Sequence, residues 1–132
     1  TDALQMMIND GVEFSSYQVR KWLDCGKKET LLETNRHLLK DRNEKIVIEG
    51  SVVIPPVAID PTAVITQSVV GPFVSIGSGT VVNKAVIRNS IIGNESQIRE
   101  IVLEDSLVGD HAKVRGEVKI LNVGHTSEID RP

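Results

Sequence analysis

Aliphatic residues recur every five or six positions between residues 57 and 120, and this period dominates the chain. Two residues before each of them stands a second residue that is small or β-branched. An amphipathic α-helix would place its inward residues three and four apart, so the pattern argues against a helix. Two inward positions and a corner in so short a repeat are typical of a parallel β-helix built from hexapeptides.

The pattern defines two sets of inward residues, one large and one small. The large set is Ile59, Ile65, Val70, Ile76, Val82, Ile87, Ile92, Ile98, Leu103, Val108, Val114 and Ile120. The small set is Val57, Ala63, Ser68, Val74, Thr80, Ala85, Ser90, Ser96, Ile101, Ser106, Ala112 and Val118. With three walls per coil, these positions predict about four coils. An ordinary β-sandwich of short strands is the competing interpretation, which so many matched pairs disfavour.

The composition agrees with a coil that has a narrow interior. Only 3% of the residues are aromatic although 40% are hydrophobic, and such an interior has little room for rings. Glycine follows several large inward residues, as at Gly77, Gly93 and Gly109. We expect these corners to require φ > 0, which glycine adopts freely.

The residues before the coil carry other patterns and predict a small α/β segment. Thr1 or Asp2 can cap a short helix that Gly11 ends. Residues 12–19 are rich in β-branched and aromatic side chains and predict a strand. Residues 21–26 contain Gly and Asp and predict a loop, in which Trp22 is expected to be a core anchor.

A second helix and the two ends of the coil complete the prediction. Leucines recur at helical period over residues 29–40, where Thr30 and Glu33 have the spacing of a capping box. Residues 46–54 predict a strand that leads into the coils. After Asn122 the ladder of inward residues ends, and we expect the tail to cover the open end of the prism.

We therefore divide the chain into residues 1–45 and residues 46–132. The second part is the hexapeptide-repeat β-helix, and the whole chain is mainly β. The first part has too little apolar surface to fold alone. It should pack on the first coils, on a partner subunit or on a larger domain.

Charge and cysteine content exclude some classes of function. The net charge is −3, with both signs spread along the chain, so nothing favours binding to nucleic acid or to an anionic membrane. No apolar run approaches the roughly 20 residues that span a bilayer. The single cysteine, Cys25, excludes an intramolecular disulfide and fits a reducing cytoplasm.

Outward residues of the predicted coils suggest self-association. Several of them are aliphatic, and exposed aliphatic patches usually mark an interface; they are Val69, Val81, Val86, Ile91 and Leu107. Charged residues are expected on the solvated faces; they are Lys84, Arg88, Arg99, Glu104 and Lys113. Dimer and trimer both remain open.

Three segments carry a resemblance to a known family: Thr1-Asp-Ala-Leu-Gln5, Trp22-Leu-Asp-Cys-Gly-Lys27 and Leu31-Leu-Glu-Thr-Asn-Arg36. In this order they resemble the end of the catalytic domain in sugar-1-phosphate nucleotidylyltransferases. The long, glucose-1-phosphate thymidylyltransferase-like members are most similar, and they carry a left-handed β-helix after that domain. Cys25 departs from the family, where Thr is usual. The family's Gly-rich nucleotide loop and first metal-binding Asp would precede Thr1.

The resemblance implies transfer of a nucleotidyl group from a nucleoside triphosphate to a sugar 1-phosphate, with release of pyrophosphate and a product like dTDP-glucose. It implies that Asp24 helps to hold Mg²⁺, and that Gly26 and Lys27 lie near substrate. From the residues alone, Asp24 could instead bond its own loop backbone, and Lys27 could be a solvated lysine. No catalytic residue is assigned within the chain, which alone is expected to be inactive.

A hexapeptide β-helix also resembles acyltransferases that use a histidine as general base. His111 and His125 are the candidates, and an amino-sugar phosphate would be the substrate. No extended loop or C-terminal helix follows them to shape a coenzyme A site, so we expect neither histidine to act as such a base.

Overall fold

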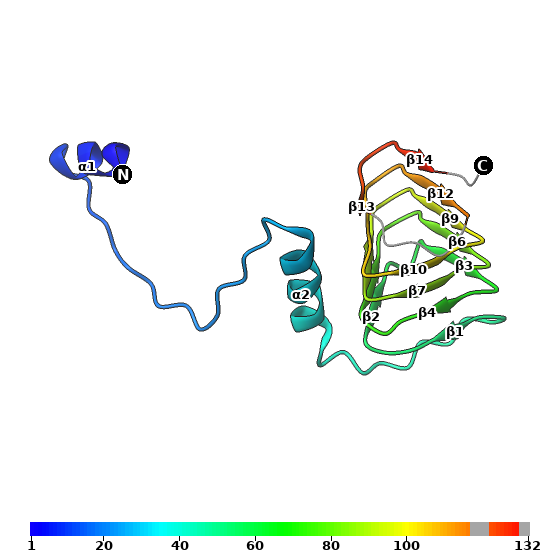
Figure 1. Cartoon of the computed structure of the whole chain (residues 1–132). Coiled ribbons are helices and arrows are strands. Elements are labelled where there is room, and N and C mark those ends of the chain that lie inside the picture. The colour runs from blue at the N-terminus through cyan, green and yellow to red at the C-terminus, as the bar shows by residue number, and fades with distance from the viewer. Residues whose placement is uncertain (117–121, 130–132) are drawn as a thin grey trace.

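The computed structural model describes residues 1–116 and 122–129, and its body is a β-solenoid of short parallel strands (Figure 1). Three sheets form its walls. Sheet A contains β1 (Val52–Val53), β4 (Val69–Val70), β7 (Val86–Arg88) and β10 (Val102–Glu104). Sheet B contains β2 (Val57–Ile59), β5 (Val74–Ile76), β8 (Ser90–Ile92), β11 (Leu107–Val108) and β13 (Asn122–Val123). Sheet C contains β3 (Val64–Thr66), β6 (Val81–Asn83), β9 (Gln97–Arg99), β12 (Lys113–Arg115) and β14 (Glu128–Ile129).

The predicted fold class is confirmed, although the solenoid is longer than expected. Within the described residues the sheets hold four, five and five strands, which makes about five turns rather than four. The described part of the tail, residues 122–129, does not cover the end of the prism as predicted. Instead β13 pairs with β11 and β14 pairs with β12, so the tail continues the coil. The left-handed sense of the coil stays a prediction.

The large inward residues stack in register from one coil to the next. Val70 pairs with Ile87, and Ile87 pairs with Leu103. All three are fully buried, as are nearly all the other predicted positions within the described residues. Ile59 and Ala63 are only partly buried, and Val118 and Ile120 lie outside the described residues. Burial of this aliphatic column is the main source of the solenoid's stability.

The small inward residues also carry hydrogen bonds that the sequence pattern did not reveal. Their hydroxyl groups accept backbone N–H groups of the next coil: Ser68 from Ala85 at 3.0 Å, Thr80 from Ser96 at 3.2 Å, Ser90 from Ser106 at 3.1 Å and Ser96 from Ala112 at 3.2 Å. A buried N–H group without an acceptor is costly. Ser and Thr therefore supply hydrogen-bond acceptors to backbone N–H groups that the pairing of strands does not satisfy.

Gly71, which follows Val70, has the predicted positive φ, at 108°, but Gly77, Gly93 and Gly109 occupy their corners for a different reason. Gly77 and Gly93 do not have positive φ; residues such as Lys84 and Glu100 do, at φ 51° each. At these positions the backbone of the next coil instead lies too close for a side chain to fit. A Cβ atom on Gly77 would lie 2.7 Å from the carbonyl carbon of Gly93 in the next coil. Gly93 meets the same limit against the coil above it, so these glycines permit stacking.

The residues before the coils form two helices and no strand. Helix α1 spans Asp2–Asn9 with Thr1 as N-cap, close to the prediction. The strand predicted over residues 12–19 is wrong, because an extended segment becomes a strand only beside another strand, and no described residue pairs with it. The strand predicted over residues 46–54 is limited to β1. Figure 1 shows α1 and the following segment extending away from the coils.

Helix α2 spans Lys28–Leu39, within one residue of the prediction, but its capping differs. Thr30 lies in the first turn, and its hydroxyl accepts the N–H of Lys27 at 3.1 Å. Thr30 is therefore not the N-cap of a box with Glu33. The spacing of Thr30 and Glu33 is that of a capping box, but the N-cap of the helix is Lys27, three residues before Thr30. The two side chains therefore do not form the predicted box.

Helix α2 packs against sheet B (Figure 1). Leu32 and Leu39 are buried. The amide of Asn35 donates to the carbonyl oxygen of Phe73 at 3.3 Å, and its oxygen accepts from Ser75 Oγ at 2.6 Å. This contact fixes the helix, and the loop immediately before it, to the side of the solenoid.

Candidate functional site

The loop before α2 holds the residues that the sequence singled out for chemistry. Asp24 Oδ1 accepts the backbone N–H of Gly26 at 2.9 Å, which forms a local turn. A Cβ atom on Gly26 would lie 3.3 Å from that same oxygen, so a small residue suits the turn. The backbone bond that the sequence offered as an alternative role for Asp24 is thus present.

Neighbouring side chains of this loop are exposed. Trp22 has 83% of its surface exposed, so it is not the core anchor that the sequence predicted within this chain. Cys25 is an exposed free cysteine whose Sγ lies 3.6 Å from Thr34 Oγ1. Lys27 is the N-cap of α2, where its backbone is engaged with Thr30 and its side chain is in solvent. The loop is anchored on the α2 side only.

Asp24 offers a donor of the kind that Mg²⁺ prefers, but it offers a single carboxylate. Its Oδ1 is engaged with Gly26, and Oδ2 accepts no hydrogen bond from the described part of the chain. Among these residues no group of three or more His, Cys, Asp or Glu side chains could hold a metal ion. Mg²⁺ requires a nearly octahedral set of oxygens, and Asp24 alone could provide no more than one part of such a set.

The two histidines lie at corners of the last coils. His125 Nδ1 accepts the backbone N–H of Asp110 at 2.8 Å. Asp110 Oδ1 accepts the N–H of Asn94 at 2.7 Å, and Asn94 Oδ1 accepts the N–H of Ser78 at 2.9 Å. His125 therefore continues a column of side chains that cap backbone N–H groups.

His111 takes no part in that column. It is exposed with φ 55°, and its backbone N–H donates to the carbonyl oxygen of Asn94 at 2.9 Å. The capping column repeats at intervals of 15 to 16 residues, from Ser78 to Asn94, Asp110 and His125. This interval is the coil length, which is the signal that could have revealed the column in the sequence.

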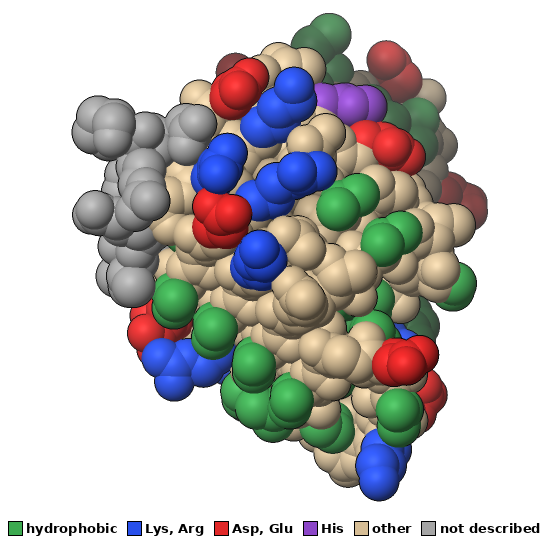
Figure 2. All heavy atoms as spheres, turned by 90° about the vertical axis from the view of Figure 1, so that its right-hand side faces the viewer, with side chains coloured by type: hydrophobic (Ala, Val, Ile, Leu, Met, Phe, Trp, Pro, Cys, Tyr) green, Lys and Arg blue, Asp and Glu red, His purple; other side chains and the backbone are tan. Residues whose placement is uncertain are grey.

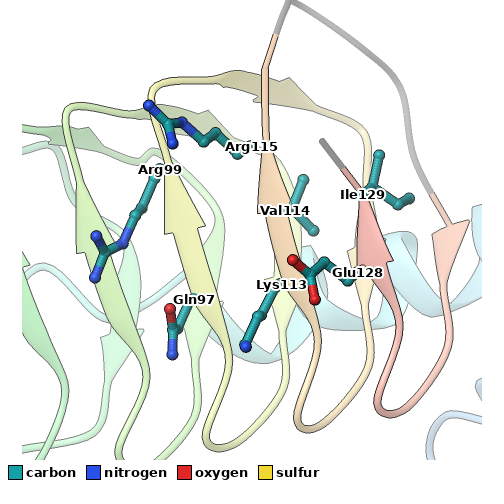
Figure 3. A pocket seen from close by; sticks show the side chains of 7 residues that line it. All are labelled: Gln97, Arg99, Lys113, Val114, Arg115, Glu128 and Ile129. Carbon is teal, nitrogen blue, oxygen red and sulfur yellow. The ribbon is translucent and has the colours of Figure 1, made fainter. Parts of the chain in front are cut away.

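A hollow of about 250 Å³ on sheet C contains Arg99 and Lys113, which the sequence had placed only on solvated faces, together with Arg115 and other residues that it had not singled out (Figure 3). The register places Gln97 beside Lys113 and Arg99 beside Arg115. Glu128 of β14 lies next to Lys113 in the same register. Figure 2 shows a group of Lys and Arg side chains in the upper half of this side of the molecule, with hydrophobic side chains below. Arg99 and Lys113 were predicted to be exposed, and they are.

None of the helices in the described part of the chain is long and apolar enough to cross a membrane. A scan against models of known protein families finds no match for the chain.

One characterised relative has a similar sequence. The chain is 31% identical to the low-salt glycan biosynthesis nucleotidyltransferase Agl11 of Haloferax volcanii over an alignment of 124 residues, which covers 74% of this chain and 34% of the relative. The chain thus spans about a third of the length of that relative. Together with the solenoid, this similarity supports a relationship to nucleotidyltransferases.

Proposed function

We propose that this chain is the C-terminal part of a nucleotidyltransferase that makes nucleoside diphosphate sugars from a nucleoside triphosphate and a sugar 1-phosphate. The observation that carries the proposal is the similarity to a nucleotidyltransferase of glycan biosynthesis. The loop at residues 22–27 resembles part of the catalytic domain of sugar-1-phosphate nucleotidylyltransferases, and this resemblance supports the proposed reaction. The coils then serve assembly or regulation, and the nucleotide and the sugar are bound by other parts of the enzyme.

The exposed apolar residues before α2 support this proposal. Helix α1 exposes Leu4 by 53% and Met6 by 66%, and the following segment exposes Tyr17 by 90% and Trp22 by 83%. Large apolar side chains that are exposed together in a folded protein usually mark a surface that another element covers. In our proposal a catalytic domain covers them, and α1 and the segment after it form its last elements.

In the proposed enzyme Asp24 supplies one carboxylate to Mg²⁺, and an aspartate of the catalytic domain supplies another. The ion would neutralise charge on the phosphates during transfer. Gly26 lets the backbone approach the ligand closely, and the exposed side chain of Lys27 is available to phosphate. Because Asp24 Oδ1 is held by Gly26, the second oxygen is the one that would face the metal.

Sheet A is the wall that we propose for self-association with a second copy of this chain. Its outward valines form one column, because Val52 pairs with Val69, Val69 with Val86, and Val86 with Val102. Val52 is 54% exposed, and the other three are partly buried. Sheet B packs against α2, and sheet C carries the cationic hollow, whereas the charged residues Arg88 and Glu104 of sheet A pair with each other. Two of the outward residues named from the sequence, Val69 and Val86, lie in this column.

The experiment is an assay of pyrophosphate release by the full-length polypeptide with a panel of nucleoside triphosphates and sugar 1-phosphates. We expect turnover that depends on Mg²⁺ and on both substrates, and no turnover by residues 1–132 alone. A parallel arm offers acetyl coenzyme A and an amino-sugar phosphate to the same proteins. Acetylation that His111→Ala or His125→Ala abolishes, without nucleotidyl transfer, would overturn the proposal.

A further inference from the structure

The hollow on sheet C sets like charges side by side. Arg99 and Arg115 occupy paired positions on β9 and β12, and neighbouring strands lie only about 4.8 Å apart. Like charges at directly paired positions destabilise a sheet. Lys113 adds a third cation two residues before Arg115 on the same face of β12. An anion bound between these cations would reduce their repulsion and so stabilise the folded sheet.

Only one of these three cations forms an ion pair with a described residue. Nε and Nη2 of Arg115 donate to Glu100 Oε2 at 3.1 and 3.0 Å. The side chains of Arg99 and Lys113 have no hydrogen bond or ion pair with any described residue. The amide of Gln97 lies next to Lys113 at the edge of the hollow (Figure 3). The hollow therefore offers a guanidinium, an ammonium and an amide that no described residue engages.

We propose that this hollow binds a compact phosphate anion, of which inorganic pyrophosphate or the diphosphate group of a nucleotide is the best match. A guanidinium binds two phosphate oxygens as a planar fork, and a lysine adds a point charge. The site lies on β9 and β12 of the coils, whereas the proposed catalytic loop precedes α2. It therefore goes beyond the proposed function and assigns the coils a ligand of their own.

The surroundings favour a small anion over a long polyanion. Glu100 and Glu128 border the hollow, and the next coils of sheet C present Val64, Thr66, Val81 and Asn83 outward. The chain as a whole carries a net charge of −3. A nucleic acid that followed the surface would leave the cations within one or two coils and meet carboxylates or neutral residues.

The test is a titration of the 132-residue chain with inorganic pyrophosphate by calorimetry and by NMR at low salt. We expect a dissociation constant below about 1 mM, and we expect this constant to rise with added salt. Arg99→Gln should weaken it about ten-fold and Lys113→Gln about five-fold, because each removes a charge-assisted contact. Glu128→Gln should tighten it a few-fold, because that change removes a carboxylate beside Lys113.

Arg88→Gln is the control for Arg99→Gln, since it removes the same single charge from an arginine that lies on sheet A, outside the hollow. This variant should bind pyrophosphate as the unchanged chain does. Failure to bind at 10 mM, or equal loss in the Arg88 and Arg99 variants, would overturn the proposal. So would tighter binding of a 20-nucleotide single strand that the same sheet C variants abolish, because the ligand would then be a polymer. Thermal stability of each variant without ligand confirms that the solenoid is intact.

Discussion

The coils bury their apolar residues, whereas the lead segment, residues 1–27, exposes them. In the coils, Ile87, Ile98 and Leu103 expose no surface at all. In the lead segment, Tyr17 and Trp22 expose most of theirs, and no residue is buried. The described coils bury their own apolar residues, because each coil packs on the next. The lead segment has apolar residues of comparable number per length but nothing in the described chain to pack on.

Backbone pairing separates the two regions in the same way. Each strand of the middle coils has a parallel partner on both sides, as β7 has in β4 and β10. Residues 12–19 have β-forming side chains but no partner strand. Burial in the coils is therefore a property of this sequence, whereas we propose that order in the lead segment depends on the catalytic domain. The predictions below test that difference.

The largest effect is expected at Asp24, in the lead segment, and only in the full-length enzyme. Asp24→Asn keeps the shape of the side chain but removes the charge that is proposed to hold Mg²⁺. Losing one preorganised electrostatic contact lowers turnover by about 10²–10³-fold in other enzymes, and we expect a similar loss. Turnover at saturating Mg²⁺ is the measurement, and an unchanged melting temperature is the control. Near-normal turnover would leave Asp24 with its turn-forming bond to Gly26 alone.

Truncation of a leucine should separate the two regions by stability. Leu103→Ala removes a side chain from the fully buried column and should lower the free energy of unfolding by about 3 kcal/mol. Leu4→Ala, at a position that is 53% exposed, should change it by less than about 0.5 kcal/mol in the 132-residue chain. Urea denaturation followed by circular dichroism measures both. Equal effects would show that the lead segment belongs to the same folding unit.

The hydroxyl groups inside the coils should matter although they are few. Thr80→Val keeps the volume but removes the acceptor of the Ser96 N–H and the donor to the Gly93 carbonyl oxygen. Leaving these buried groups unpaired should cost about 1–3 kcal/mol. Thr66→Val, which breaks an exposed bond to Asn83, is the control and should cost less than about 0.5 kcal/mol. Similar values for the two variants in urea denaturation would refute the role of the interior hydroxyls.

The smallest effect concerns a corner of the first coil. The side-chain and backbone hydrogen bonds from Thr62 lower the pKa of Asp60 below its ordinary value of 3.8. A lowered folded-state pKa means that Asp60 stabilises the fold above pH 3.8, and that this contribution is lost as pH falls through the folded-state pKa. Asp60→Asn should flatten this part of the stability–pH curve by a small amount, as urea midpoints between pH 5 and pH 2.5 would show. An unchanged slope would mean that the Thr62 bonds do not favour the carboxylate.

The coil could be predicted from the sequence because its signal is repeated in every turn. A period of five or six residues survives the irregular spacing of individual coils, so Ile65 through Val114 were placed on the correct face. Segments without a repeat were predicted from propensity alone. Residues 12–19 failed there, because strand propensity reports suitable side chains and cannot supply a neighbouring strand.

Close contacts between distant residues could not be predicted. The sequence suggested that the corner glycines need positive φ, which holds for Gly71, whereas Gly77 and Gly93 are required by a carbonyl group one coil away, about 16 residues along the chain. The cationic hollow was missed for the same reason. Arg99 and Arg115 become neighbours only when the coil length fixes their register. For Asp24 the structure adds one local bond to Gly26, and the metal role stays a prediction.

The central claim is that the lead segment is ordered by the rest of a longer enzyme and not by this chain. Amide hydrogen exchange of residues 12–22 tests it most directly, measured in the 132-residue chain and in the full-length polypeptide, with β7 to β10 as the internal standard. The account predicts rapid exchange of residues 12–22 in the short chain, strong protection in the full-length protein, and equal protection of the coils in both. Protection of residues 12–22 in the short chain, or rapid exchange in both proteins, would contradict it.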